Sequence, residues 1–275
     1  MRLLGPGMRR LLFVAGLLVF AAGIQLFVFT ERTARFFAWT VEPPITAAFL
    51  GASYWASVAL EWTAARERVW ARARIAAPAV FVFTTLTLIA TVMHLDRFHL
   101  GDDFAPSTQL VTWTWIVVYA AVPPLLAVLM VAQSRIAGAD SPRSARLPRW
   151  LRAVLVLEAV ALGAVGVALF ADPEGAFSLW PWALTPLTAR AIAAWLIGIA
   201  IAAAHSAFEN DFRRVRPAAV SYVLLGLLHS VVVMRYSEQI EWGPRAWAYV
   251  GVIVVSVLVG LYAWTVAWRA EFRPG

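Results

Sequence analysis

Two residue types are absent from this chain, and charge of either sign is scarce. Without cysteine there can be no disulfide bond, thiolate nucleophile, iron–sulfur cluster or Cys-ligated zinc. Without lysine there can be no Schiff base with retinal or pyridoxal phosphate, because all 23 basic residues are arginines. Charged residues make up 14% of the chain, against about 25% in a soluble domain. Nucleotide-binding and familiar hydrolase motifs are also missing, so we expect no cofactor and favour a non-enzymatic role.

Hydrophobic residues, in contrast, are abundant and come in long blocks. They make up 61% of the 275 residues, and the mean hydropathy is +0.73. A helix needs about 20 apolar residues to cross the hydrocarbon core of a bilayer. Blocks of this length predict an all-α, polytopic integral membrane protein with about eight transmembrane helices. The predicted spans are residues 11–30, 44–63, 75–95, 109–132, 152–171, 186–206, 217–234 and 247–268.

The arginines predict the orientation of these spans. Seventeen lie at the two chain ends and in alternate loops, and six lie in the other loops or at their edges. The positive-inside rule then places both termini in the cytoplasm. The larger group comprises Arg2, Arg9, Arg10, Arg66, Arg68, Arg72, Arg74, Arg135, Arg143, Arg146, Arg149, Arg152, Arg213, Arg214, Arg216, Arg269 and Arg273, and the smaller comprises Arg32, Arg35, Arg97, Arg190, Arg235 and Arg245.

The same arginines bear on partners and localisation. Arg-rich cytoplasmic loops lie against the anionic lipids of the inner leaflet, so the net charge of +7 does not require nucleic acid as a partner. High alanine and arginine content without lysine is typical of a GC-rich genome. The composition therefore indicates a multi-pass protein of a bacterial plasma membrane.

Two stretches of the chain resemble each other. Residues 26–47 read LFVFTERTARFFAWTVEPPITA, and residues 169–189 read LFADPEGAFSLWPWALTPLTA. Trp39 and Trp182 fall in register if one residue is skipped. Both stretches connect an odd span to the next even span, so we expect two parallel four-helix repeats related by an axis along the membrane normal. Chance similarity between short apolar strings is the alternative.

This duplication predicts the domain organisation. The first four-helix repeat covers residues 1–135, a basic cytoplasmic loop covers 136–151, and the second repeat covers 152–275. Within the repeated stretch, Pro44 and Pro186 suit the first position of a helix, where a missing N–H costs no hydrogen bond. Thr185 is placed to cap the sixth span. The repeated motif is thus explained by structure without invoking function.

Two charged residues inside spans of the second repeat have no charged counterpart in the first. Glu158 lies in the fifth span and Arg190 near the start of the sixth, where the first repeat has apolar or small residues. An intramembrane charge is costly unless it is paired or lines a polar cavity. We therefore predict that Glu158 and Arg190 face the interior and act as a pair or relay. The alternative is that Arg190 snorkels to the outer surface or pairs with Asp172 or Glu174.

Polar faces on two other spans suggest the walls of a cavity between the repeats. Thr84, Thr87, Thr91 and His94 follow a spacing that places them on one helical face. Tyr222 and His229 form a similar face on the seventh span. The alternative is that each threonine bonds back to its own helix. A bis-histidine haem between His94 and His229 is disfavoured, because the two residues lie at different depths.

The loop after the third span is rich in metal-binding residue types. Imidazole and carboxylate groups there could hold a divalent ion, but their spacing matches no metal motif, and a solvated acidic loop is the alternative. These residues are His94, Asp96, His99, Asp102 and Asp103.

Taken together, these patterns favour permeation or transport of a small solute through a polar site between the repeats. The first alternative is a non-catalytic membrane subunit or scaffold, whose charged residues only pair internally. A weaker alternative is an intramembrane enzyme that uses Glu158 or a histidine. The sequence identifies neither the solute nor a protein partner.

Overall fold

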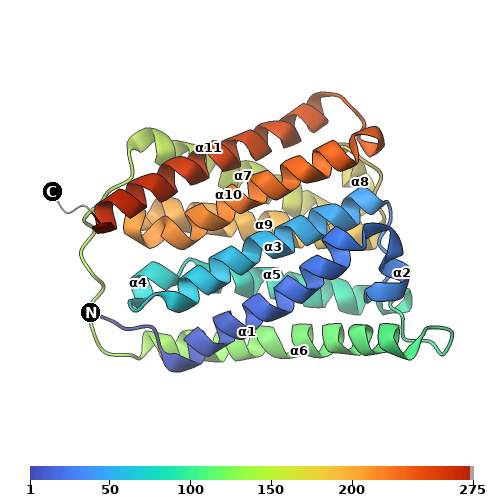
Figure 1. Ribbon diagram of the computed structural model, residues 1–275, viewed down its shortest axis with the longest axis horizontal. Helices are drawn as coiled ribbons and strands as arrows, with labels where there is room; N and C mark the ends of the chain where they lie inside the picture. Colours follow the sequence, from blue (N-terminus) through green and yellow to red (C-terminus); the bar gives the residue numbers. More distant parts are fainter. Residues whose placement is uncertain (273–275) are drawn as a thin grey trace.

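Eight long helices lie side by side in an elongated bundle (Figure 1). The computed structural model describes residues 1–272, so Arg273 lies outside the described part. The long helices are α1 (Pro6–Gly23), α3 (Pro44–Arg66), α5 (Ala76–Met93), α6 (Pro106–Ser134), α7 (Arg149–Ala171), α9 (Pro186–Glu209), α10 (Phe212–Arg235) and α11 (Pro244–Phe272). The short helices are α2 (Thr33–Phe36), α4 (Trp70–Ala73) and α8 (Pro173–Ala176), and a π-helical turn, Ile24–Val28, extends α1.

Seven of the long helices are long and apolar enough to span a membrane, which confirms an all-α polytopic membrane protein. The exception is α3. Its 23 residues would reach about 35 Å, enough to cross. Most of its residues are buried against other helices and many are Ala, Ser or Thr, so it contacts little lipid and needs less hydropathy. The count of eight spans therefore stays a prediction.

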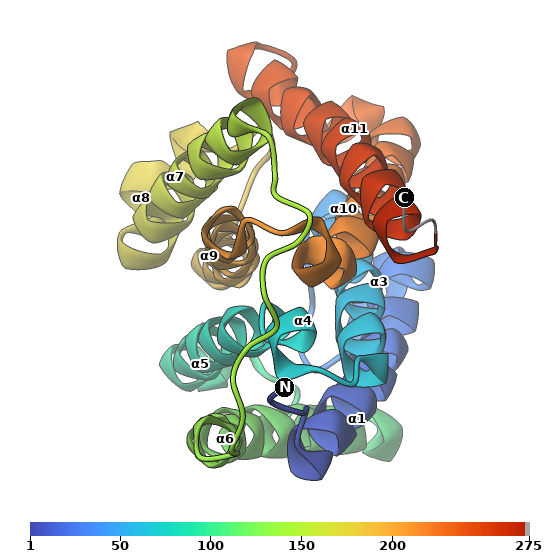
Figure 2. The same cartoon turned by 90° about the vertical axis from the view of Figure 1, so that its left-hand side faces the viewer.

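The helices form an inner and an outer set (Figure 2). The inner helices α3, α5, α9 and α10 pack across the middle, with α3 against α10 and α5 against α9. The outer helices α1, α6, α7 and α11 each pack on an inner one, in the hairpin pairs α1–α3, α5–α6, α7–α9 and α10–α11. The first four long helices thus contact the last four mainly through two helix pairs, α3–α10 and α5–α9, each made of one inner helix from either half.

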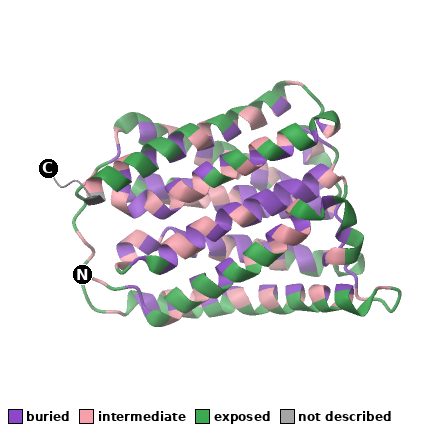
Figure 3. Cartoon of the chain, viewed as in Figure 1, coloured by how far each residue is buried: buried purple, intermediate pink, exposed green. Residues whose placement is uncertain are grey.

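Burial follows this division (Figure 3). The most apolar window of α9 is 61% buried, whereas those of α6 and α7 are 22% buried. Large side chains such as Val128 of α6 and Val160 of α7 point outward and are exposed, as expected for helices that face lipid.

The N-terminus and the end of α11 lie at the same end of the bundle, which we call the terminal end (Figure 1). The opposite end, which carries α2 and α8, is called the distal end. Pro44 and Pro186 begin α3 and α9 there, and Thr185 caps α9, with its hydroxyl accepting from the Thr188 backbone N–H at 3.2 Å. The predicted starts of these two helices and the Thr185 cap are confirmed.

Candidate functional site

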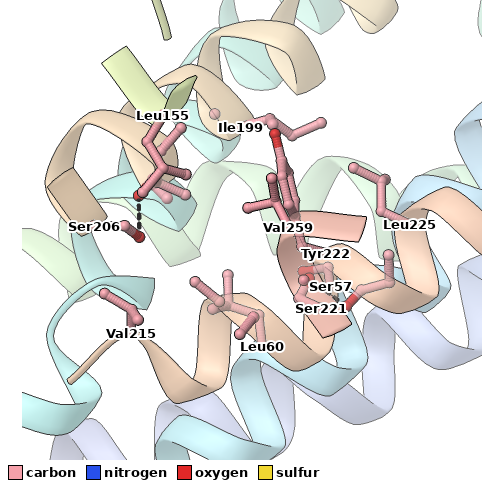
Figure 4. Close-up of a pocket in the computed structure, with 18 of the residues that line it drawn as sticks. Ser57, Leu60, Leu155, Ile199, Ser206, Val215, Ser221, Tyr222, Leu225 and Val259 are labelled. Atoms are coloured by element: carbon pink, nitrogen blue, oxygen red, sulfur yellow. Dashed lines mark hydrogen bonds between the residues drawn. The ribbon is translucent and has the colours of Figure 1, made fainter. Parts of the chain in front are cut away.

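Two adjoining cavities lie inside the bundle. The central cavity, about 90 Å³, is lined by the four inner helices, with α7 and α11 at its edge. The lateral cavity, about 230 Å³, lies among α7, α9, α10 and α11. Ile199, Tyr222 and Leu225 border both, and Figure 4 shows them at one side of the central cavity. A buried water needs about 10–15 Å³ of such space, so each cavity has room for a small molecule.

The wall of the central cavity is mostly apolar. Its polar side chains are Trp195, with an indole N–H, and five residues with hydroxyls, namely Tyr222, Ser53, Ser57, Ser206 and Ser221. Ser206 donates to Ala202 O at 2.7 Å and Ser221 donates to Ala56 O at 2.8 Å (Figure 4). The protons of these two hydroxyls are therefore used in hydrogen bonds to helix carbonyls. Among the described residues, no charged side chain lines this cavity.

Glu158 lies immediately behind this wall. It is 8% exposed, and its Oε2 accepts a 2.7 Å hydrogen bond from the Tyr222 hydroxyl. Its Oε1 is buried without a hydrogen-bond partner. Leu155 and Leu162, on the same face of α7, line the central and the lateral cavity respectively. The structure therefore brings together two of the residues singled out in the sequence, Glu158 and Tyr222, at the junction of the cavities.

His229 belongs to a hydrogen-bonded chain beside the lateral cavity. Its Nδ1 lies 2.7 Å from the Tyr249 hydroxyl and its Nε2 lies 3.2 Å from Ser53 Oγ, while Ser53 Oγ donates to Phe49 O at 3.0 Å. Because the serine proton is used on the carbonyl, Nε2 carries the ring proton and Nδ1 accepts from Tyr249. Every member of the chain is satisfied with a neutral imidazole.

Arg190 does not pair with Glu158, so that prediction is wrong. Its Nη1 donates to His94 Nε2 at 2.9 Å and its Nε donates to Phe170 O at 3.2 Å. Phe170 lies 12 residues beyond Glu158 on α7, which corresponds to about 18 Å along the helix. Arg190 and Glu158 therefore lie at different depths with separate partners. The Arg190 contact joins α9 to the end of α5.

The predicted threonine face bonds back to its own helix. The hydroxyls of Thr84, Thr87 and Thr91 donate at 2.8 Å to the carbonyls of Val80, Phe83 and Thr87 respectively. Thr91 Oγ1 also accepts from the Trp115 indole at 3.0 Å. The lining of the two cavities includes none of these threonines. These hydroxyls are thus used within α5, and that of Thr91 also joins α5 to α6.

The predicted metal loop does not assemble a metal site. The described residues contain no group of three or more His, Asp or Glu side chains placed to hold an ion. Asp102 and Asp103 are exposed, and Asp96 pairs with Arg97 at 3.1 Å in the open. His99 is buried and turned the other way: its Nδ1–H donates to Phe37 O at 2.9 Å, and its Nε2 lies 3.0 Å from the Thr40 hydroxyl.

The two histidines of this loop have perturbed titration. Burial lowers the pKa of His99 below its usual value. Burial, followed by the neighbouring Arg190 guanidinium, also lowers the pKa of His94. Both imidazoles are therefore neutral at physiological pH, which suits His94 Nε2 as the acceptor of the Arg190 hydrogen bond.

At the terminal end, arginines and glutamates form a network of ion pairs. In the sequence these arginines predicted only the orientation of the spans, not this network. Each half carries the pattern Glu-x4-Arg-x-Arg, as ERVWARAR at 67–74 and ENDFRRVR at 209–216. Arg74 Nε donates to Glu209 Oε1 at 2.5 Å, and Arg216 Nη2 donates to Glu67 Oε1 at 2.7 Å. The second arginine of each pattern thus pairs with the glutamate of the other half.

The first arginine of each pattern lies beside its own glutamate. Arg214 Nη1 is 2.7 Å from Glu209 Oε2, and Arg72 Nη1 is 3.9 Å from Glu67 Oε2. His205, one turn earlier on α9, adds a contact of 3.2 Å to Glu209. The Glu209 side chain is completely buried, so its charge depends on these partners. The recurrence of one pattern 142 residues later is the signal that could have found this network.

A second buried carboxyl was also missed in the sequence. Glu61 on α3 is 1% exposed; its Oε1 accepts from Ser57 at 3.0 Å, and its Oε2 is buried without a hydrogen-bond partner. Its position inside a predicted apolar span was the available signal. Ser57 lines the central cavity, so each half places one carboxyl next to a residue of that wall.

No protein-family model matches this chain, and no significant match is found among curated proteins or solved structures.

Proposed function

We propose that this membrane protein transports a small, uncharged solute through the central cavity between its two halves. The observation that carries the proposal is the position of this cavity among α3, α5, α9 and α10, the four helices through which the halves meet. Binding sites between repeated helix bundles, near mid-membrane, are typical of transporters that rock one bundle against the other.

Closure at both ends supports this reading. Toward the terminal end, Glu209 follows the cavity residue Ser206 by three residues, about 4.5 Å along α9. The ion pairs of Glu209 and Glu67 hold the halves together there. Toward the distal end, the Phe49 ring lies one turn from Ser53 and packs on His229 and Trp180 with centroid distances of 4.6 and 5.4 Å. This arrangement corresponds to an occluded state.

An internal duplication explains why the halves meet symmetrically. Residues 142 or 143 positions apart make equivalent contacts: the Trp70 N–H donates to Arg2 O, and the Phe212 N–H donates to Ala145 O. The cross-half ion pairs follow the same offset. Both repeats run in the same direction through the bundle, which supports a two-fold axis along the membrane normal that passes between the halves.

Close helix contacts inside each half follow that offset as well. A Cβ at Gly23 of α1 would come within 2.1 Å of Trp55 on α3, and a Cβ at Gly166 of α7 would come within 2.8 Å of Ile197 on α9. Gly166 is 143 residues after Gly23, and Ile197 is 142 after Trp55. These matched approaches favour duplication over chance similarity.

The lining indicates the class of solute. A charged solute would leave water for a wall of mostly apolar residues, aliphatic and aromatic, with five hydroxyls and one indole N–H. This is a large desolvation cost that no opposite charge in the described lining offsets. An uncharged molecule with one or two hydrogen-bonding groups matches this wall. Glu158, held behind Tyr222, is placed to sense the occupant through the tyrosine hydroxyl.

A non-catalytic membrane subunit is the second candidate. It is favoured by the internally satisfied threonines of α5 and by the His229 chain, which give part of the interior a purely structural role. The two candidates differ in whether water and solute enter the central cavity.

The arginine distribution supports an orientation for this transport. The terminal end carries 16 of the described arginines, and the distal end carries six. We infer that the terminal end faces the cytoplasm of a bacterial cell and contacts anionic lipid. The ion pairs would then form the cytoplasmic closure.

Cysteine accessibility tests the proposal directly, since the native chain has no cysteine to interfere. Ser57→Cys and Ser206→Cys place thiols in the central cavity, Ser134→Cys is an exposed positive control at the end of α6, and Val128→Cys is a lipid-facing negative control. In membrane vesicles, a small water-soluble thiosulfonate should label the cavity positions more slowly than Ser134→Cys but faster than Val128→Cys.

Opening the terminal closure sharpens the test. Adding Arg74→Met and Arg216→Met should accelerate labelling of Ser206→Cys and leave Val128→Cys unchanged. Cavity thiols as unreactive as the lipid-facing control, with or without the arginine substitutions, would exclude a water-accessible path and favour the subunit role.

A further inference from the structure

The lateral cavity exists because the second half is less filled than the first. In the first half, Tyr54, Trp115 and Tyr119 pack together, with a 2.6 Å hydrogen bond between the two tyrosine hydroxyls. The residue 142 positions after Tyr54 is Leu196. Counted from the first proline of α6 and of α11, the counterpart of Trp115 is Ile253. Leu196 and Ile253 both line the lateral cavity.

The mouth of this cavity opens toward lipid. Its walls include Ala161 on α7 and Ala248 on α11, both exposed and on opposite sides. The two outer helices approach each other elsewhere, where the Trp150 and Tyr262 rings lie 5.2 Å apart. Since α7 and α11 both meet the criteria for membrane spans, the opening between them faces the bilayer.

One residue of the cavity wall carries an unsatisfied hydrogen-bond donor. The indole nitrogen of Trp180 is buried and has no hydrogen-bond partner, although Trp180 lines the cavity at the distal end. Its neighbour Trp182 donates to Thr46 Oγ1 at 2.9 Å. A buried N–H without a partner is costly, and an acceptor oxygen that reaches it from the cavity would remove that cost.

Charge limits the occupant. Arg245 is the charged residue in the described lining, and it is committed to Glu241 at 2.8 Å and to the carbonyls of Ser178 and Trp180 at 3.1 Å. An anionic head group would have to displace those contacts. Deeper in the cavity, Leu162, Val165 and Val252 present an apolar surface.

We propose that the lateral cavity binds a membrane-borne, neutral single-chain amphiphile. The hydroxyl or carbonyl oxygen of its head group accepts the hydrogen bond of Trp180 Nε1, and its chain runs inward along α11 toward Tyr222. From Arg245 to Ser256 the wall of α11 is about 16 Å long, which accommodates a medium-length chain. This site does not depend on the transport proposed for the central cavity.

Photolabelling tests the site with a defined probe. The purified protein in nanodiscs is irradiated with a medium-chain fatty alcohol that carries a diazirine in its chain, and labelled residues are mapped by mass spectrometry. Labels are expected on the cavity-facing residues of α7 and α11 and should be displaced by the same alcohol without the diazirine. Labels spread evenly over lipid-facing residues of all outer helices would overturn the site.

Matched variants separate filling of the cavity from general perturbation. Ile253→Trp restores the bulk found at Trp115, and Ala248→Phe narrows the mouth without entering the core. Each should reduce specific labelling at least fivefold, whereas Val254→Trp, on the exposed face of the same helix, should not. Unchanged labelling in a folded Ala248→Phe protein contradicts the proposal even if Ile253→Trp fails to fold.

The hydrogen bond has its own control. Trp180→Phe keeps a ring but removes the donor, and should weaken labelling by about three- to tenfold. Trp39→Phe removes an equally unpartnered buried indole N–H in the first half and should have no effect. A fatty acid of the same chain length should compete less well than the alcohol; better competition by the acid, or equal effects of the two tryptophan variants, would overturn the neutral head group bound to Trp180.

Discussion

Arg74 and Glu209 come from different halves of the chain, yet Arg74 Nε lies 2.5 Å from Glu209 Oε1. The converse pair, Arg216 and Glu67, has the same chemistry at 2.7 Å. The two pairs differ modestly in burial: the Glu209 side chain is 0% exposed against 6% for Glu67, and Arg74 is 18% exposed against 26% for Arg216. Of these two symmetry-related ion pairs, Arg74–Glu209 is therefore the more buried and Arg216–Glu67 the more accessible.

This difference predicts unequal effects of removing the two arginines. Arg74→Met leaves a buried carboxylate with Arg214 and His205 only, and should lower the free energy of unfolding by about 3 kcal/mol. Arg216→Met acts on a slightly more exposed pair, in which Arg72 still lies 3.9 Å from Glu67, and should cost less, about 2 kcal/mol. Thermal unfolding in detergent measures both.

The double variant Arg74→Met with Glu209→Met provides the control. It removes both charges, so it should be more stable than the sum of the single effects predicts. Equal losses of unfolding free energy for the two arginine variants, or additivity in the double variant, would contradict a stabilising buried ion pair between Arg74 and Glu209.

The helices themselves were predictable from hydrophobic block length. The predicted helix boundaries were wrong where charged residues belong to a helix and had been assigned to a loop. The seventh span was expected at residues 217–234, but α10 begins at Phe212, because Asp211 accepts hydrogen bonds from the N–H groups of Arg213 and Arg214 and thereby caps the helix. The arginines that resembled a loop form its first turn.

The polar partners were less predictable, because they depend on which helices become neighbours and at what depth. His94 and Arg190 meet since the end of α5 abuts the start of α9 across the halves. Nothing in either span encodes that contact. The Glu-x4-Arg-x-Arg pattern did encode a cross-half contact, but only when its two copies are read as halves of one symmetric pair.

Glu158 and Arg190 should behave as independent residues. They have separate partners, and Glu158 lies about 18 Å along α7 from Phe170, which Arg190 contacts. Distant sites usually give additive changes in stability. We expect the loss of unfolding free energy in Arg190→Ala with Glu158→Gln to equal the sum of the single losses within about 0.5 kcal/mol. A larger interaction term would indicate coupling that the geometry does not contain.

Tyr222 should couple to Glu158 instead. Tyr222→Phe deprives the buried carboxyl of its hydrogen-bond donor and should cost about 1–3 kcal/mol. In a Glu158→Leu background, the same tyrosine substitution should cost much less, because no carboxyl remains to be satisfied. The same thermal melts measure this pair, and an unchanged cost in the two backgrounds would argue against the Tyr222–Glu158 hydrogen bond.

Acidification should destabilise the loop that follows α5. Burial lowers the pKa of His99, and burial together with Arg190 lowers the pKa of His94. The unfolded chain therefore binds more protons than the folded one below pH about 6.5, so stability is present above that pH and declines as the pH falls. The decline continues until the folded histidines are themselves protonated.

Neutral replacements test this pH dependence. The difference between the melting temperatures at pH 7.5 and 5.5 should shrink in His99→Gln with His94→Gln, leaving the part that comes from the buried, neutral His229, whereas His205→Gln, at the opposite end of the bundle, should retain the native decline. A native protein equally stable at both pH values would show that neither histidine is held neutral by its surroundings.

The orientation of the bundle decides between eight spans and seven. Reporters fused after Arg74, Arg149 or Arg216 lie at the terminal end and should read cytoplasmic, and those after Gly101, Gly175 or Gly243 should read external. If α3 did not cross the membrane, every reporter from Arg74 onward would read on the side opposite to the one predicted here. The ion pair of Arg74 and Glu209 could then not close a cytoplasmic gate. A reporter fused after Arg10, before the first predicted span, is the reference for the Arg74 fusion, and two crossings, α1 and α3, separate the two positions. Reporters that read on the same side require α3 to cross the membrane. Reporters that read on opposite sides would refute the eight-span bundle.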